Sequence, residues 1–219
     1  MAAIHGAFRL AAILVLPLFA AACTTAAMEP ATQARPVETS PEVLRYGAVT
    51  DEKFAIPAVE LKHLTPRNRR QLIDYPTDQP PGTVVVDPQN RFLYLVQEGG
   101  KAMRYGVGVG KAGLEFTGTG VIGYKRQWPR WTPTQDMIKR EPERYGPLAD
   151  GMEPGPTNPL GARALYLFKD GQDTLFRIHG TNETWSIGKA VSSGCIRMMN
   201  QDVIDLYGRV PNGSKVVVL

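Results

Sequence analysis

Cys195 and His179 are the two residues of this sequence whose types could carry out covalent catalysis. A cysteine thiolate is a strong nucleophile, and a neighbouring imidazole can take the thiol proton and later return it to a leaving group. Each residue lies beside a glycine, because Gly180 follows the histidine and Gly194 precedes the cysteine. A glycine next to a nucleophile lets a substrate carbonyl approach the backbone and leaves amide N–H groups for an oxyanion hole. The pair therefore indicates covalent catalysis by a cysteine.

The residues around this pair carry more information than the pair itself. A buried cysteine is commonly an inert small hydrophobe, and cysteine–histidine spacings do not transfer between families of cysteine enzymes. This chain, however, reads His-Gly-Thr at 179–181 and Ser-Ser-Gly-Cys-Ile-Arg-Met at 192–198, with Asn200 beyond. The string resembles the catalytic signature of the L,D-transpeptidases, the YkuD family, and the resemblance extends from about Thr83 to Leu219. It departs at Ser193, where many members carry a second histidine; that position is not the general base, so we expect an altered oxyanion pocket rather than an inactive site.

The resemblance implies a substrate and a role for each residue of the motif. Family members cut the peptidoglycan stem peptide at the amide between its third residue and the D-Ala that follows. Cys195 is then the nucleophile and His179 the general base. The main-chain carbonyl of Gly180 orients the imidazole. The backbone N–H groups of Ser193, Gly194 and Cys195 hold the oxyanion.

The resemblance leaves the acceptor open. An amine of another stem would open the thioester to make a cross-link, a protein lysine would attach a protein to peptidoglycan, and water would make the enzyme an L,D-carboxypeptidase. We also expect His179 to give Cys195 a reactive thiolate at pH 7. The family is known for acylation by carbapenems. No metal and no other cofactor is implied, because one histidine and one free cysteine do not make a zinc site.

Two further residues of the cysteine loop are candidates for binding. Arg197 fits two roles equally well, a fork-shaped partner for a substrate carboxylate or an ion pair that fixes the loop. Ser192 is expected to form hydrogen bonds within the loop. A non-catalytic envelope-binding lipoprotein with an inactive transpeptidase fold is the alternative from another functional class, and the intact motif weighs against it. A papain-like protease would place its cysteine near the mature N-terminus and its histidine far downstream, the reverse of the order here.

The composition is that of a globular protein with one sizeable domain. The chain has 219 residues, of which 43% are hydrophobic and 21% are charged. Its 18 prolines and 22 glycines favour turns over long helices. The net charge of +4 fits attraction to an anionic cell envelope, but it is too small to indicate nucleic-acid binding, and no basic stripe is interleaved with aromatic residues.

The first 22 residues have the pattern of an export signal. Arg9 supplies the positive charge, and the apolar run from Leu10 to Ala22 is too short to span a bilayer. Small residues precede Cys23, which resembles the lipidation site of bacterial lipoproteins, although Ala20 stands where a leucine is usual. We expect lipidation of Cys23, with ordinary signal cleavage near the same place as the alternative. The protein would then lie in the periplasmic cell envelope, anchored to a membrane.

The remainder of the chain divides into three parts. Residues 23–48 are rich in Ala, Thr, Pro and Glu without apolar periodicity, which predicts a disordered tether. Residues 49–82 form an N-terminal extension in which 65–73 is expected to be a short helix capped by Thr65, with His63 before it as a structural or surface residue. Residues 83–219 form the catalytic domain.

The catalytic domain is expected to be mainly β, a sandwich or barrel of mixed sheets with a few short helices. Its predicted strands cover 83–87, 91–96, 102–109, 118–125, 164–168, 174–178 and 215–219. A long connection at 127–161 contains a helical piece at 135–140, and Trp128 and Trp131 are equally compatible with packing and with lining a substrate groove. After the cysteine, Asn200 is expected to cap a helix that ends at Gly208.

Overall fold

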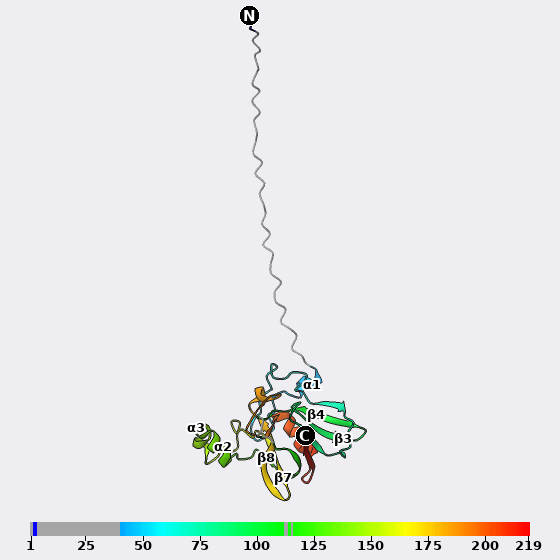
Figure 1. Ribbon diagram of the computed structural model, residues 1–219, viewed down its shortest axis with the longest axis vertical. Helices are drawn as coiled ribbons and strands as arrows, with labels where there is room; N and C mark the ends of the chain where they lie inside the picture. The colour runs from blue at the N-terminus through cyan, green and yellow to red at the C-terminus, as the bar shows by residue number, and fades with distance from the viewer. Residues whose placement is uncertain (1, 4–39, 112–113, 115) are drawn as a thin grey trace. The chain divides into compact units, whose positions relative to one another are not determined.

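The computed structural model describes residues 2–3, 40–111, 114 and 116–219 (Figure 1). The predicted signal, Cys23 and the tether up to residue 39 therefore lie outside the described residues, apart from Ala2 and Ala3. Within the described part of the chain, no helix is long and apolar enough to cross a membrane.

A nine-stranded mixed sheet forms the centre of the domain, in the order β1-β4-β3-β2-β11-β6-β7-β8-β10. The strands are β1 (Gln71–Asp74), β2 (Val84–Asp87), β3 (Phe92–Gln97), β4 (Lys101–Gly106), β6 (Gly118–Gln127), β7 (Arg163–Lys169), β8 (Gln172–Thr181), β10 (Ile196–Met199) and β11 (Lys215–Val218). β11 pairs with β2, and β10 with β8, in parallel; the other neighbours are antiparallel. β5 (Val109–Gly110) and β9 (Ala190–Ser192) form a separate parallel pair. The prediction of a mainly β domain with mixed sheets is confirmed.

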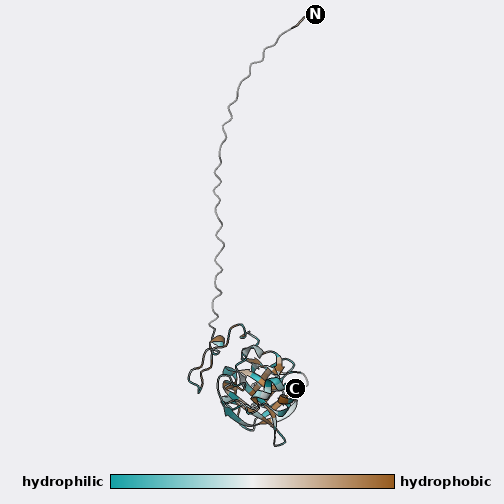
Figure 2. Ribbon diagram, turned by 90° about the vertical axis from the view of Figure 1, so that its left-hand side faces the viewer, coloured by the Kyte–Doolittle hydropathy of each residue, from teal (hydrophilic) through white to brown (hydrophobic). Residues whose placement is uncertain are grey.

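Apolar side chains from the central strands fill one core together with the last helix. Val84, Leu93, Leu165 and Ile178 have no exposed surface, and Leu206 of α4 (Asn200–Arg209) joins them. Figure 2 shows hydrophobic segments, in brown, among the strands of the domain. Each predicted strand of the catalytic domain has a counterpart, because β-branched and apolar runs between turn residues favour strands that bury one face in such a core.

Short helices lie outside the sheet in the connection between β6 and β7. They are α2 (Gln135–Arg140), α3 (Pro142–Tyr145) and the 3-10 turn η1 (Gly146–Leu148). Thr134 caps α2, since its hydroxyl accepts a hydrogen bond from the Met137 amide at 3.2 Å. In Figure 1, α2 and α3 form a lobe that projects from the domain beside β8. The helix predicted at 135–140 is confirmed.

The helix predicted at 65–73 is wrong. Residues 66–68 form a turn, and Gln71–Asp74 instead pair with β4 as the edge strand β1. The backbone amide of Arg70, which a helix would use internally, donates to the hydroxyl of Tyr46 at 2.5 Å. Pairing with an open sheet edge thus outweighed the local helix signal of Thr65 and Pro66.

Part of the predicted tether is also folded. Residues 40–48 include the short helix α1 (Pro41–Leu44), and Val43 and Tyr46 are buried in a small cluster that includes Met199. The Tyr46 hydroxyl donates to Asp202 at 3.2 Å, and burial raises the pKa of that carboxyl to about 7. The disordered-tether prediction is therefore wrong for 40–48. The side chains of Val43 and Tyr46 pack against the domain and hold this segment in place.

A carboxylate of the N-terminal extension fixes the start of β7. Glu52 accepts two hydrogen bonds from the Arg163 guanidinium and one from the Trp128 indole at 2.9 Å. These hydrogen bonds hold the extension against both ends of the connection between β6 and β7, because Trp128 begins that connection and Arg163 follows it. His63 is partly buried and its Nδ1 lies 2.9 Å from the Thr184 hydroxyl, which fits the structural role expected of it.

Asn200 does not cap α4 as predicted. The N-cap residue is Met199, and the Asn200 side chain instead accepts from the Ala162 amide at 2.9 Å and donates to the Thr181 carbonyl at 3.2 Å. The helix continues through Gly208 to Arg209. Asn200 thereby ties the start of β7 to the end of β8, which helps to hold the strand that carries His179.

Candidate active site

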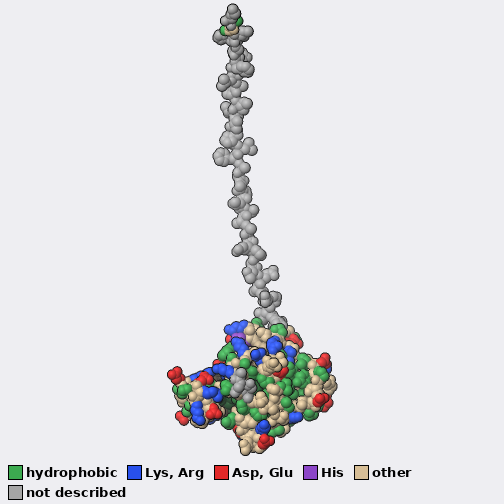
Figure 3. Space-filling view, in the orientation of Figure 1, with side chains coloured by type: hydrophobic (Ala, Val, Ile, Leu, Met, Phe, Trp, Pro, Cys, Tyr) green, Lys and Arg blue, Asp and Glu red, His purple; other side chains and the backbone are tan. Residues whose placement is uncertain are grey.

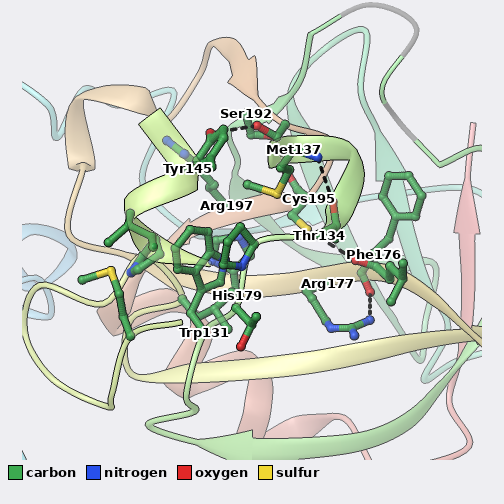
Figure 4. A pocket seen from close by; sticks show the side chains of 18 of the residues that line it. Trp131, Thr134, Met137, Tyr145, Phe176, Arg177, His179, Ser192, Cys195 and Arg197 are labelled. Atoms are coloured by element: carbon green, nitrogen blue, oxygen red, sulfur yellow. Dashed lines mark hydrogen bonds between the residues drawn. The ribbon is translucent and has the colours of Figure 1, made fainter. Parts of the chain in front are cut away.

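Parallel pairing of β8 with β10 brings the two predicted catalytic residues together. Arg197 of β10 lies opposite His179 of β8, and Ile196 lies opposite Ile178. Cys195 immediately precedes β10, so the thiol and the imidazole open into the same cavity (Figure 4). Two adjacent strands of a rigid sheet are a precise way to hold such a pair.

His179 is held in the tautomer that a general base needs. Its ring is buried, with 4% of its surface exposed, and Nδ1 lies 2.6 Å from the Gly180 carbonyl oxygen. A carbonyl can only accept, so Nδ1 carries the proton and Nε2 keeps its lone pair. Burial, the largest cause, acts together with the charges of Arg197 and Arg177 to lower the pKa of His179 to about 4, against the opposing effect of the Gly180 bond. The imidazole is therefore neutral at pH 7.

The thiol of Cys195 is protonated in the free site. Burial raises its pKa, although a backbone hydrogen bond from Arg177 and the charges of Arg177 and Arg197 act in the opposite direction. Its hydrogen-bond partner is the main-chain carbonyl of Leu175, with Sγ and O 3.9 Å apart. Desolvation of the charged form thus outweighs the two arginines and favours the protonated thiol, the opposite direction from the thiolate that the pairing with His179 predicts. The arrangement instead suits proton transfer from thiol to imidazole during attack.

The loop before the nucleophile is shaped by its serine and its glycine. Ser192 donates through its hydroxyl to the Cys195 carbonyl at 2.6 Å and accepts from the Gly194 amide at 3.2 Å. Gly194 has φ of 128°, and a Cβ there would lie 2.8 Å from the Phe176 ring. Only glycine fits this position. Ser192 forms the internal bonds expected of it, and one of these bonds uses the Gly194 amide as its donor.

Arg197 is engaged within the chain. Its Nη1 lies 2.7 Å from Glu183 Oε2, and 14% of its side chain is exposed. Its charge also reaches both members of the pair, since it contributes to the pKa of His179 and of Cys195. Of its two predicted roles, the ion pair is the one present in the free site.

A cavity of about 910 Å³ opens in front of the pair. One wall is β8 with the cysteine loop. The α2–α3 lobe supplies the other through Met137 and Tyr145, together with Trp131 from the segment before α2 (Figure 4). The rings of Trp131 and Tyr145 lie 6.2 Å apart. The two tryptophans therefore have different roles. Trp131 lines the cavity, whereas Trp128 is buried against Ile56 and Ala162.

The cavity is lined by more positive than negative side chains. Two carboxylates face it, Asp136 and Glu183. Its arginines outnumber them and are Arg130, Arg140, Arg144, Arg177 and Arg197. Figure 3 shows charged side chains of both signs over the lobe.

Most of these arginines have a carboxylate partner in the chain. Arg130 pairs with Glu153 at 2.7 Å, Arg144 with Glu141 at 3.2 Å, Arg177 with Asp173 at 2.6 Å and Arg197 with Glu183 at 2.7 Å. Arg140, in the last turn of α2, forms no ion pair or side-chain hydrogen bond with the described residues. It is the lining arginine left to meet a ligand anion.

Sequence reasoning missed three residues that surround the pair. Leu175 supplies the thiol's acceptor, Asp173 supports Leu175 through a hydrogen bond to its amide at 2.8 Å, and Tyr145 lies with its hydroxyl 3.2 Å from that of Ser193. The sequence predicts a plain strand at Leu175, a turn before that strand at Asp173, and a loop at Tyr145. No local pattern distinguishes them, because their roles arise from the fold of the strand and the lobe.

Comparison with known proteins supports one family. The family model for the L,D-transpeptidase catalytic domain, YkuD, matches residues 81–218. The probable L,D-transpeptidase ErfK/SrfK of Escherichia coli K12 is 34% identical over 140 residues, which cover 63% of this chain and 44% of that protein. The probable L,D-transpeptidase YbiS of the same strain is 33% identical over 137 residues, covering 62% and 43%. The aligned part of the chain thus spans less than half the length of these relatives.

One solved structure shares more of its sequence with this chain. It is described as a probable carnitine operon oxidoreductase caia from Brucella melitensis, is 53% identical, and covers 72% of this chain and 98% of its own, with a TM-score of 0.49. Its described activity belongs to that protein alone. Because the family match covers more than half of the residues and includes both Cys195 and His179, this chain belongs to the YkuD family of L,D-transpeptidase catalytic domains.

Proposed function

We propose that this protein is an L,D-transpeptidase that acts on peptidoglycan stem peptides through an acyl-enzyme at Cys195. The observation that supports the proposal is that Cys195 and His179 line the same cavity, with Nδ1 of the buried imidazole fixed by the Gly180 carbonyl. That arrangement gives a nucleophile and an oriented base at the floor of a cavity large enough for a peptide.

The chemistry follows from the protonation states. Cys195 Sγ attacks the carbonyl of the third stem residue while its proton passes to Nε2 of His179. The same proton then goes to the amine of the departing D-Ala as the C–N bond breaks, which leaves a thioester. The amides of Ser193, Gly194 and Cys195 would hold the oxyanion, and the Gly194 amide exchanges its bond with Ser192 for this purpose. An incoming amine then opens the thioester and restores the thiol.

The test is mass spectrometry of tetrapeptide muropeptides incubated with the purified protein. We expect release of D-Ala with formation of a cross-linked dimer, and neither product with Cys195→Ala or His179→Ala. Water as acceptor would give the tripeptide alone, and a protein lysine would give a peptide-modified protein when one is supplied. Normal D-Ala release by Cys195→Ala contradicts the covalent mechanism and favours a non-catalytic envelope-binding role.

We also propose that residues 1–22 direct export and that Cys23 carries lipid, which would keep the domain at a membrane of the periplasmic cell envelope. The support is the apolar run that ends in small residues before Cys23. The intact mass of the native mature protein tests this. A mature chain that begins at an unmodified residue rules out the anchor, whereas an acylated Cys23, lost together with membrane association in Cys23→Ser, supports it.

A further inference from the structure

β8 carries an irregular segment, residues 174–176, directly opposite the nucleophile. The register with β7 pairs Phe168 with Asp173 and Tyr166 with Arg177, so three residues of β8 face a single residue of β7. At the centre of this bulge Leu175 has φ of 64°, in the left-handed region that residues other than glycine seldom adopt. Bulges next to active sites commonly turn a backbone or side-chain group toward the chemistry.

Side chains of the strand itself hold the bulge in place. Asp173 accepts a hydrogen bond from the Leu175 amide at 2.8 Å, and its carboxylate forms a fork with the Arg177 guanidinium at 2.6 and 2.8 Å. The Thr174 hydroxyl donates to the Leu167 carbonyl at 2.7 Å and accepts from the Phe176 amide at 3.2 Å. Backbone strain maintained by such specific bonds is found chiefly at functional sites.

The bulge contacts the nucleophile and its loop from one side. The Leu175 carbonyl is the acceptor for the Cys195 thiol, and the Phe176 ring fills the space that a side chain at Gly194 would need. The Leu175 side chain is 58% exposed and lines the cavity. A thiol has one proton, so a thiol that donates to Leu175 is not donating to His179. A ligand that moves Leu175 therefore changes the partner of this proton.

We propose that Leu175 and Asp173 are positioning residues for the nucleophile: the Leu175 carbonyl holds the Cys195 thiol protonated in the empty site, and substrate seated against the Leu175 side chain releases that proton to His179. The substrate-release step rests on the proposed transpeptidase function. The hydrogen bond between the thiol and the Leu175 carbonyl does not rest on that function, because it is present without substrate. Arg177, Arg197 and Asp173 are the charged groups that act on the thiol, and they stay in place in the first variant pair below.

The experiment compares Leu175→Gly with Leu175→Val. Glycine adopts the left-handed conformation freely, whereas a β-branched side chain disfavours it, so the first variant keeps the carbonyl in place and the second turns it away. The readout is the rate of alkylation by iodoacetamide over a pH series, with the adduct assigned to the peptide that contains Cys195. We expect the wild-type midpoint for the glycine variant. For valine we expect a midpoint lower by about half a pH unit, because a weak S–H···O bond that favours the protonated thiol is lost.

A valine variant with the wild-type midpoint, or equal shifts in both variants, overturns the proposal. Thermal unfolding shows whether each variant is folded. If the valine variant is not, the pair Asp173→Asn and Asp173→Ala replaces it, since both remove the charge and only asparagine keeps an acceptor for the Leu175 amide. The alanine midpoint is expected below that of asparagine, and equal midpoints overturn the proposal. Alkylation needs no peptidoglycan, so this result stands whether or not the protein proves to be a transpeptidase.

Discussion

The phenol of Tyr145 lies 3.2 Å from the hydroxyl of Ser193, so the α2–α3 lobe is tied directly to the loop that carries the nucleophile. Tyr145 is buried, and Ser193 stands two residues before Cys195. Ser193 is also the position at which the sequence departs from the usual family motif. The departure thus provides a hydroxyl partner for the lobe, and the far wall of the cavity is fixed relative to the thiol.

Loss of this bond should loosen the lobe rather than stop the chemistry. We expect Tyr145→Phe and Ser193→Ala each to raise KM for a tetrapeptide about five-fold with a smaller change in kcat, since one neutral hydrogen bond is worth about 1 kcal/mol. The double variant tests the contact itself, because two residues that act through one bond give effects that do not add. Strictly additive effects on KM in steady-state assays would show that the two hydroxyls act separately.

The pH dependence of turnover should report the buried imidazole. His179 has to be neutral to act as a base, and burial lowers its pKa to about 4. We therefore expect the acidic limb of kcat/KM to lie near pH 4, with activity still full at the pH where an ordinary histidine is half protonated, about 6.5. An acidic limb near that ordinary value, measured in a constant-ionic-strength buffer series, would mean that the imidazole is solvated in the working enzyme.

The same lowered pKa has a consequence for stability. Between about pH 6.5 and 4 the unfolded chain binds a proton at His179 that the folded protein does not, so the contribution of this group is complete above the unfolded pKa and falls as the pH approaches 4. The free energy of unfolding lost through this group is about 3 kcal/mol at most. Urea unfolding at two pH values should show a smaller acid destabilisation in His179→Ala than in the wild type. Equal losses in the two proteins would contradict the lowered pKa.

A carbapenem should acylate the protein once, at Cys195. The thiol is protonated in the free site, so attack on the strained ring needs His179 to take the proton. We expect no adduct with Cys195→Ala, and acylation of His179→Ala slowed by about 10²–10⁴-fold, the range for a lost general base. Intact mass against time gives both values. An adduct that persists without Cys195, or forms at the wild-type rate without His179, would remove this pair from the mechanism.

Arg140 should contribute to the binding of an anionic substrate. It lines the cavity without a carboxylate partner among the described residues, whereas Arg144 nearby is paired with Glu141. We expect Arg140→Gln to raise KM for a stem tetrapeptide by about three- to ten-fold at low salt and to leave kcat close to that of the wild type, as for a screened interaction of about 1 kcal/mol. The matched control is Lys139→Gln, which removes the same charge from the adjacent position outside the cavity lining. Equal effects of the two variants would indicate that the positive charge at the end of α2 attracts the substrate, rather than a direct contact with Arg140.

Much of the catalytic site was determined by local sequence. The pairing of Cys195 with His179 followed from a contiguous motif, and strand β8, which carries His179, followed from an apolar run bounded by turn residues. Strand β10, which follows Cys195, was not predicted. Gly194 was recognised because a close approach of backbone to a nucleophile requires glycine, and the structure places the Phe176 ring where a side chain would stand. Such features depend on neighbours in the chain, so the chain alone specifies them.

Tertiary structure decided the remaining features, since each depends on what a distant segment offers. Residues 71–74 became an edge strand because β4 presented an open edge, and Trp128 became a core residue because Glu52 and Ile56 cover it while Trp131 faces the cavity. The protonation of Cys195 was predicted in the wrong direction. The sequence shows a partner imidazole, but the desolvation that raises the pKa of the thiol comes from groups that only the folded chain brings around it.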